Sequence, residues 1–166
     1  EFLVKLASSG IKFRVPTYTN VTSIDLERWE ELGIPKSYAE TQLKGVGAWK
    51  ELGAIINCSC MPFFSGAIPR FGEHVAYADT STVIFGNSYF GARSNRESDL
   101  VCLAAAVTGR VPKFGYHLDE NRKGQYLIEV QIPLKSESDF GALGYHIGKI
   151  VKEKVPVFKS AYEQNL

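Results

Sequence analysis

The end of the chain carries the pattern that most constrains its fold. In residues 126–132, with the sequence YLIEVQI, the side chains at even and at odd positions would lie on opposite faces, and Glu129 and Gln131 would share one of them. This pattern is typical of a half-buried β-strand. A helical pattern then runs from Asp139, as its cap, to Ile150, and the apolar residues 155–158 indicate a last strand. A strand, a helix and a strand in this order predict a βαβ unit with parallel strands.

Helix-like and strand-like segments also alternate earlier in the chain. Apolar residues at three-residue spacing predict a helix over residues 23–32. Ser37 and Glu40 have the spacing of a capping box, which predicts a second helix that ends at Gly53. The short apolar run at residues 54–57 then predicts a buried strand.

A further helix is predicted in the middle of the chain, where Ser94 and Glu97 form another possible capping box and Gly109 supplies the stop. Residues 80–85 are β-branched but lie among loop-forming residues, so they fit either a strand or a helix. The alternation predicts the α/β class, with layered helices around a mostly parallel or mixed sheet. We expect a single α/β domain over residues 1–166.

Composition indicates which kinds of partner the protein has and in which cellular compartment it occurs. The 166 residues carry 19 basic and 18 acidic side chains without charged blocks, which argues against a nucleic-acid surface. No apolar run approaches the roughly 20 residues that cross a membrane, and the first residues do not resemble a signal peptide. Three cysteines are too few for a disulfide framework. We therefore expect a cytoplasmic protein whose partners are a small molecule or another protein.

Thirteen residues before the middle helix, FGNSYFGARSNRE, concentrate hydrogen-bonding groups. Arg93 and Arg96 would lie at the entrance of that helix, where the positive end of the helix dipole attracts anions. Arginine binds carboxylate or phosphate through two parallel hydrogen bonds. The segment therefore predicts an anion-binding corner, unless both arginines are solvated or pair with Glu97 and Asp99.

The cysteines and histidines are the remaining candidates for chemistry. An iron–sulfur cluster with one open iron needs three thiolates, and the chain has three cysteines: Cys58, Cys60 and Cys102. Their spacing equally fits buried structural thiols. His74 follows a glutamate, and His117 is close to several acidic residues, so both could transfer protons near neutral pH. The alternative for His117 is a solvated polar turn.

Two long segments, CMPFFSGAIPRFGEHVAYADTSTVIFGNSYFGARSNRE and LAAAVTGRVPKFGYHLDENR, resemble the catalytic subunit of the aconitase X family. The family's stretches are similar to C-T-P-Y, F-G-E-H-x-A-W, A-N-S-x-x-G-A-R-T-N-R and A-x-T-G-R-x-P-x-x-G-x-H-L-D-E-N-R. The resemblance implies an aconitase-like fold and a hydro-lyase reaction at an iron–sulfur cluster of unknown nuclearity or a mononuclear iron. Archaeal members dehydrate 5-phosphomevalonate in a modified mevalonate route, and bacterial relatives dehydrate cis-3-hydroxy-L-proline. The sequence is closer to the archaeal form.

The resemblance also implies roles for single residues. Cys60 matches the metal-ligand cysteine, and His74 and His117 match positions that line or brace the cavity and become the candidate catalytic residues. The candidate substrate-binding residues are Asn87, Ser88, Arg93, Asn95 and Arg96. The chain departs from the family at Met61 and Phe63, which replace Thr and Tyr, and at Tyr77 and Asp79, which replace Trp and Glu. These departures leave open the alternative that the chain is a non-catalytic anion-binding or assembly domain.

Catalytic subunits of the family are more than twice as long as this chain, so the resemblance implies that it is an internal part of such a subunit. Further cysteine ligands are expected beyond Leu166. A small swivelling subunit or domain with the serine expected to act as base is a further implied partner. Alone, the chain is expected to lack turnover.

Overall fold

The computed structural model describes residues 1–160, which form two compact units. The first comprises Glu1–His117, and the second begins at Leu118. The expectation of a single domain over residues 1–166 stays a prediction. Within the described part of the chain, no helix combines the length and the apolar character that crossing a membrane requires.

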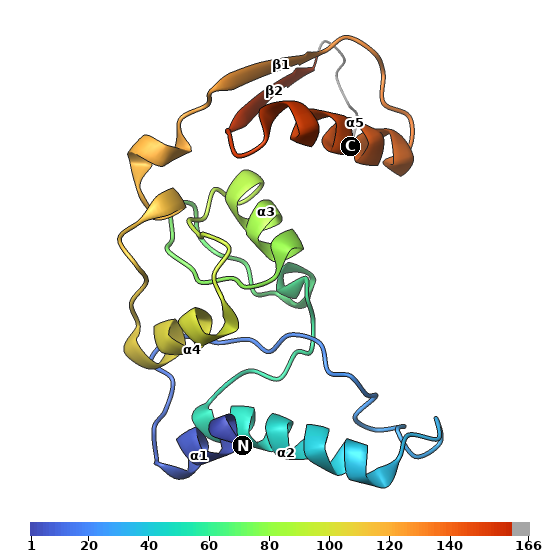
Figure 1. Cartoon of the computed structure of the whole chain (residues 1–166), viewed down its shortest axis with the longest axis vertical. Coiled ribbons are helices and arrows are strands. Elements are labelled where there is room, and N and C mark those ends of the chain that lie inside the picture. Colours follow the sequence, from blue (N-terminus) through green and yellow to red (C-terminus); the bar gives the residue numbers. More distant parts are fainter. Residues whose placement is uncertain (161–166) are drawn as a thin grey trace. The chain divides into compact units, whose positions relative to one another are not determined.

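The second unit is a βαβ unit, as predicted (Figure 1). Strand β1, Tyr126–Val130, pairs in parallel with β2, Pro156–Ser160. Helix α5, Glu137–Val151, connects them. Its N-terminus carries a capping box in which Ser136 is the cap and Asp139 is the reciprocal partner, so the predicted cap lies three residues too late.

Two helices pack against each other in the first unit (Figure 1). Helix α1 spans Phe2–Ser8 and α2 spans Lys36–Leu52. The predicted end of α2 is confirmed, because Gly53 ends it with a φ of 98°. The predicted capping box is wrong, because α2 begins directly after Pro35 and no side chain caps it.

The helix predicted over residues 23–32 is also wrong, because these residues form successive turns. Asp25 Oδ1 accepts the backbone N–H groups of Glu27 and Arg28, both at 2.9 Å, and so stabilises a local turn in place of a continuous helix. Leu32, which belongs to the expected apolar stripe, is 58% exposed, so this stripe is not buried against the rest of the protein.

The strand predicted over residues 54–57 is reduced to an isolated parallel bridge between Ile55 and Tyr18. Ile55 N–H donates to Thr17 O at 2.8 Å, and Thr19 N–H donates to Ile55 O at 3.1 Å. Ile55 is 47% exposed, which corrects the expectation of a buried strand.

Two further helices flank the FGNSYFGARSNRE motif. Helix α3, Thr80–Ser88, begins after Asp79, whose side chain accepts the N–H of Ser81. This settles the segment that fitted either a strand or a helix: the local cap and the following turns make it helical.

Helix α4, Asp99–Thr108, confirms the predicted middle helix and ends at Gly109. The predicted capping box of Ser94 and Glu97 is wrong, because the cap is Ser98, whose hydroxyl accepts the N–H of Val101 at 3.3 Å. Short 3₁₀ helices at Pro62–Ser65, Gly115–His117 and Asp119–Arg122 complete the elements. The α/β class is confirmed, with a two-stranded parallel sheet.

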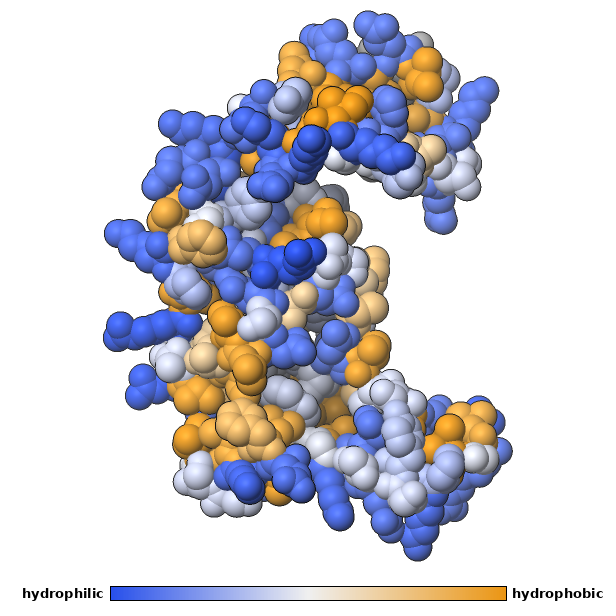
Figure 2. Space-filling view, viewed as in Figure 1, coloured by the Kyte–Doolittle hydropathy of each residue, from blue (hydrophilic) through white to orange (hydrophobic). Residues whose placement is uncertain are grey.

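Small side chains make up much of the buried apolar core of the described residues. Leu52 is the largest fully buried apolar residue, and many other buried apolar residues are alanines: Ala7, Ala39, Ala48, Ala92, Ala105 and Ala106. Large apolar side chains lie instead at the surface, including Phe71 at 91% exposure, and Figure 2 shows apolar areas among the polar ones.

Candidate functional site

Two extended segments, residues 73–77 and 93–97, lie side by side in the first unit. Arg93 N–H donates to Glu73 O at 2.8 Å, Val75 N–H donates to Arg93 O at 3.0 Å, and Glu97 N–H donates to Tyr77 O at 2.9 Å. This parallel pairing brings the FGEH and GARSNRE motifs together.

Helix α3 is attached to the second of these segments through Asn87. Its Nδ2 donates to Ser94 O at 2.9 Å and to Val83 O at 2.8 Å, while its Oδ1 accepts the Ser94 N–H at 3.3 Å. The neighbouring Ser88 hydroxyl donates to Ile84 O at 2.6 Å within the same helix. Asn87 and Ser88, which were predicted to bind substrate, thus make hydrogen bonds to the backbone in this chain.

Ser94 was predicted to cap a helix but is a buried connector, with 1% of its surface exposed. Its hydroxyl accepts the Tyr77 N–H at 3.1 Å and donates to Asn95 O at 2.6 Å. The hydroxyl therefore joins the two extended segments.

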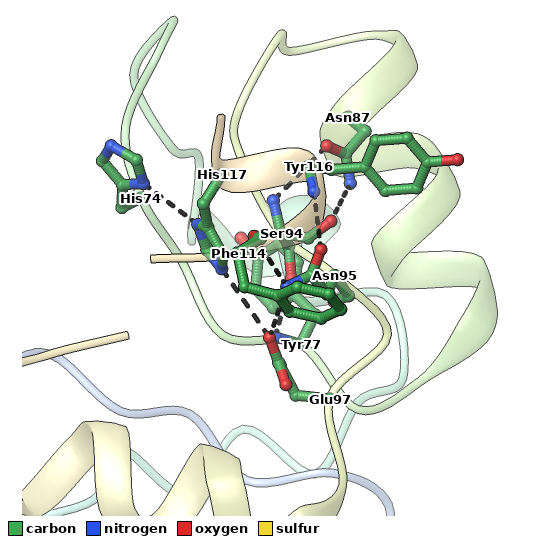
Figure 3. A network of polar contacts seen from close by, with 9 residues as sticks. All are labelled: His74, Tyr77, Asn87, Ser94, Asn95, Glu97, Phe114, Tyr116 and His117. Carbon is green, nitrogen blue, oxygen red and sulfur yellow. Dashed lines mark hydrogen bonds and ion pairs between the residues drawn. The ribbon is translucent and has the colours of Figure 1, made fainter. Parts of the chain in front are cut away.

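Asn95 lies at the centre of a second set of hydrogen bonds (Figure 3). Its Oδ1 accepts the Tyr116 N–H at 2.7 Å. Its Nδ2 donates to Phe114 O at 3.2 Å and to Glu97 Oε1 at 3.1 Å. Because the backbone N–H can only donate and the carbonyl can only accept, these partners fix the orientation of the amide.

The side chains of His74 and His117, far apart in sequence, lie edge to edge. Their Nδ1 atoms lie 3.0 Å apart, and their ring centroids are 5.2 Å apart with an interplanar angle of 26°. His117 is buried and His74 is exposed. On the inner side, His117 Nε2 lies 3.7 Å from Glu97 Oε1, as Figure 3 shows. The structure thus brings both predicted histidines together with a carboxylate.

A cavity of about 770 Å³ lies in the first unit, and both Cys60 and His74 line it. Neither Arg93 nor Arg96 is among its lining residues, and the same holds for Asn87, Ser88, Asn95 and His117. The cysteine that was predicted to bind metal and an imidazole therefore line one cavity, whereas the predicted anion-binding residues are not among its lining residues.

The arginines do not lie at a helix entrance as predicted. Helix α4 begins at Asp99, after a separate cap, and Arg93 and Arg96 belong to the extended segment before it. Arg93 Nη1 donates to the carbonyl oxygen of His117 at 3.1 Å, and Arg96 is exposed. Anion binding by this pair stays a prediction.

All three cysteines are free thiols. Burial, followed by the carboxylates of Glu97 and Asp99, raises the pKa of Cys102 to about 11, which disfavours the thiolate that binds metals. Cys60 is half-buried, and its carbonyl oxygen accepts the Thr82 hydroxyl. Among the described residues, no group of three or more histidine, cysteine or acidic side chains is placed to hold a metal ion. These residues alone therefore do not fit a complete iron–sulfur site.

The departures at positions 63 and 77 are explained by packing. Phe63 is 5% exposed, and its ring contacts Tyr77 edge-on at 5.9 Å between centroids. Phe85 and Phe90 pack on the same ring at 5.3 and 4.9 Å. Burial, then the charge of Glu73, raises the pKa of Tyr77 to about 12, so this phenol stays protonated near neutral pH. Nothing in the structure explains Met61.

Two parts of the network were not predicted from the sequence. Glu97 was assigned to a capping box, and Phe114 and Tyr116 contribute through backbone groups, which no side-chain pattern reveals. The position of Glu97, two residues after Asn95, could have indicated the contact with its amide.

Comparisons with known proteins identify the family of this chain. A family model described as the aconitase X first domain matches residues 1–120. The phosphomevalonate dehydratase large subunit of Methanocaldococcus jannaschii is 45% identical over 99% of this chain and 42% of its own length. The cis-3-hydroxy-L-proline dehydratase of Pseudomonas aeruginosa is 36% identical over 94% of this chain and 27% of its own length.

A solved structure has the same fold. The holo-form of Thermococcus kodakaraensis aconitase X superposes with a TM-score of 0.81 at 34% identity, over 97% of this chain and 40% of that one. The chain thus spans about two fifths of its archaeal relatives. The family model, the identities and the superposition together establish that the chain belongs to the aconitase X family.

Proposed function

We propose that this chain is part of a hydro-lyase that removes water from 5-phosphomevalonate to give an anhydromevalonate phosphate. The identity of 45% with an archaeal phosphomevalonate dehydratase large subunit, against 36% with a bacterial cis-3-hydroxy-L-proline dehydratase, supports this substrate over the alternative. Because the chain spans only part of these relatives, the activity is assigned to the full-length enzyme.

The observation that carries the proposal is the position of Cys60 and His74 on one cavity. Dehydration removes a proton from carbon and breaks a C–O bond, and the departing hydroxyl leaves as water when it receives a proton. An imidazole has a pKa suited to that proton transfer near neutral pH. In this proposal His74 supplies the proton, and the serine expected in the small subunit removes the other one.

Cys60 is proposed as one ligand of an iron or iron–sulfur centre. When bound, such a centre acts as a Lewis acid on the hydroxyl. The described residues supply too few ligands for it, so the others are assigned to segments beyond this chain. Cys60 and Cys102 both line the cavity together with His74, and the raised pKa of Cys102 disfavours its thiolate, which supports Cys60 as the ligand.

Substrate phosphate or carboxylate is proposed to bind near Arg93 and Arg96. Arg96 is exposed, while Arg93 is half-buried and donates to the backbone of His117. Of the two, Arg96 is therefore the better placed to reach a ligand brought in by another part of the enzyme. Asn87, Ser88 and Asn95 then support substrate binding by holding the surrounding backbone.

The proposed partner is a small subunit that completes the site. The relatives' names contain the words "large subunit", which supports such a partner. The packing of Phe63 against Tyr77 weakens the alternative of a non-catalytic domain, because that departure from the family has a structural reason.

The test is a pair of dehydration assays on the full-length protein with its small subunit, purified without oxygen. Formation of anhydromevalonate phosphate from 5-phosphomevalonate supports the proposal, and turnover of cis-3-hydroxy-L-proline alone reassigns the substrate. If neither acid loses water, the proposed function fails. Cys60→Ser should lower the bound iron, whereas Cys102→Ser should leave it unchanged because burial keeps the Cys102 thiol protonated.

A further inference from the structure

We propose that Glu97 and His117 are positioning residues that restrict the proton exchange of His74 to its Nε2 atom. This inference rests on the proposed function only for its kinetic consequence. The geometry behind it is the contact from Glu97 to His117 and from His117 to His74 (Figure 3).

The two histidine rings share one proton. The Nδ1 atoms lie 3.0 Å apart, which is a hydrogen-bonding distance, so one nitrogen carries the hydrogen and the other accepts it. Two arrangements of neutral rings meet this condition. In one His74 donates, and in the other His117 donates.

Glu97 distinguishes between the two arrangements. If His117 carried its proton on Nδ1, its Nε2 lone pair would face Glu97 Oε1 at 3.7 Å, with 2% of the His117 side chain and 10% of the Glu97 side chain exposed. A lone pair facing a carboxylate at so dry a site is unfavourable. The carboxylate therefore places the His117 proton on Nε2 and leaves Nδ1 as the acceptor for His74.

A doubly protonated His117 would also satisfy Glu97, but it would reverse the bond between the rings. Burial opposes that charge, because His117 is 4% exposed and a buried imidazolium is disfavoured.

The orientation of Glu97 is fixed in turn by Asn95. The same Oε1 that faces His117 accepts Asn95 Nδ2 at 3.1 Å. The Asn95 amide cannot turn over without losing its bonds to Tyr116 N–H and Phe114 O. The backbone of residues 114–116 thus holds the carboxylate in place.

The consequence for His74 is that Nδ1 keeps its proton in both charge states of this ring. Only Nε2 can then gain or lose a proton, and in Figure 3 this part of the ring points away from the network. His74 is also one of the residues that line the cavity.

The test reads the protonation of each ring nitrogen by long-range ¹H–¹⁵N NMR near neutral pH, on the deuterated full-length protein with labelled histidine. His117→Gln and His74→Gln assign the two rings, and the exposed His146 serves as a reference. The expected His117 spectrum shows a protonated Nε2 and an unprotonated Nδ1. A protonated Nδ1 on His117, whether neutral or doubly protonated, overturns the proposal.

Glu97→Gln tests the cause. Removing the charge should shift the His117 nitrogens towards the reversed tautomer. It should also lower kcat about ten-fold with little change in KM. Glu97→Asp keeps the charge and should restore part of the original tautomer and part of kcat. Glu31→Gln, which removes an exposed carboxylate paired with Arg28 at 2.9 Å, is the matched control and should change neither. An unchanged His117 spectrum in Glu97→Gln overturns the role of the carboxylate. Because the spectrum is recorded without substrate, it decides the inference even if neither hydroxy acid is turned over.

Discussion

Asn87 and Ser94 exchange two hydrogen bonds across the FGNSYFGARSNRE motif: the Asn87 amide donates to Ser94 O at 2.9 Å, and the Ser94 N–H donates to Asn87 Oδ1 at 3.3 Å. A side chain of α3 thereby replaces the backbone partner that a neighbouring strand would provide. The concentration of polar residues in this motif has a structural explanation, because several of them bond to the backbone of the motif itself.

Asn87→Ala should lower the free energy of unfolding by about 1–3 kcal/mol, because it leaves the buried Ser94 N–H without this acceptor. Chemical denaturation of the full-length protein measures the change. Ser8→Ala removes an exposed hydroxyl that bonds only within α1 and should change stability by less than about 0.5 kcal/mol. Equal effects of both variants would contradict the role of Asn87.

Gly86→Ala should destabilise the packing between α3 and the aromatic rings. The new methyl group would lie 2.9 Å from Tyr77 Cε2 and 3.7 Å from Phe63 Cζ. Overpacking of this kind costs about 1–3 kcal/mol, which exceeds the roughly 1 kcal/mol that alanine gains in helix propensity. Gly47→Ala in α2 is the control, since nothing lies within 4 Å of its new methyl, and it should raise the melting temperature. A stabilised Gly86→Ala would refute the contact.

Gly115→Ala should disturb the site as well as the fold. Gly115 has a φ of +58°, and an added Cβ would overlap Asn95 Oδ1. Displacement of this amide releases Glu97, so the unprotonated Nδ1 signal of His117 should be lost. Gly33→Ala has a similar φ of +69° with no atom within 4 Å, and it should show only the backbone cost of about 1 kcal/mol. An intact His117 signal in Gly115→Ala would contradict the link.

The sequence predicted those elements whose signals are local. Strand β1 and helices α4 and α5 follow from periodicity, and Gly53 and Gly109 end their helices as expected. The failures arose where another local interaction competed. Asp25 bonds to the backbone of the next residues and holds a turn, although the apolar spacing there was helical.

The candidate site was predicted in part. The sequence singled out His74 and His117 separately, but their contact depends on the pairing of residues 73–77 with 93–97. Such pairing over a long sequence distance leaves no periodic signal. The contact of Glu97 with His117 was missed for the same reason, whereas its contact with Asn95 is local.

Cys102 provides a prediction about pH. Its pKa is raised from 9.0 to about 11, first by burial and then by Glu97 and Asp99. At pH values below both the ordinary and the raised pKa, a shift of this size lowers the thiolate fraction about 100-fold. Alkylation of Cys102 in the native protein, followed by peptide mass spectrometry, should therefore keep accelerating with pH up to about 11.

The unfolded protein supplies the reference for that measurement, because its Cys102 should reach a plateau above its ordinary pKa of 9.0. A native plateau at that same pH would show that slow alkylation reflects steric access alone. The shift also has a consequence for stability. Because the folded-state pKa is the higher one, the stabilisation from Cys102 is complete below pH 9 and is lost as the pH rises through about 11. Cys102→Ala should therefore lose less stability than the parent protein over that range, and an identical loss would contradict the raised pKa.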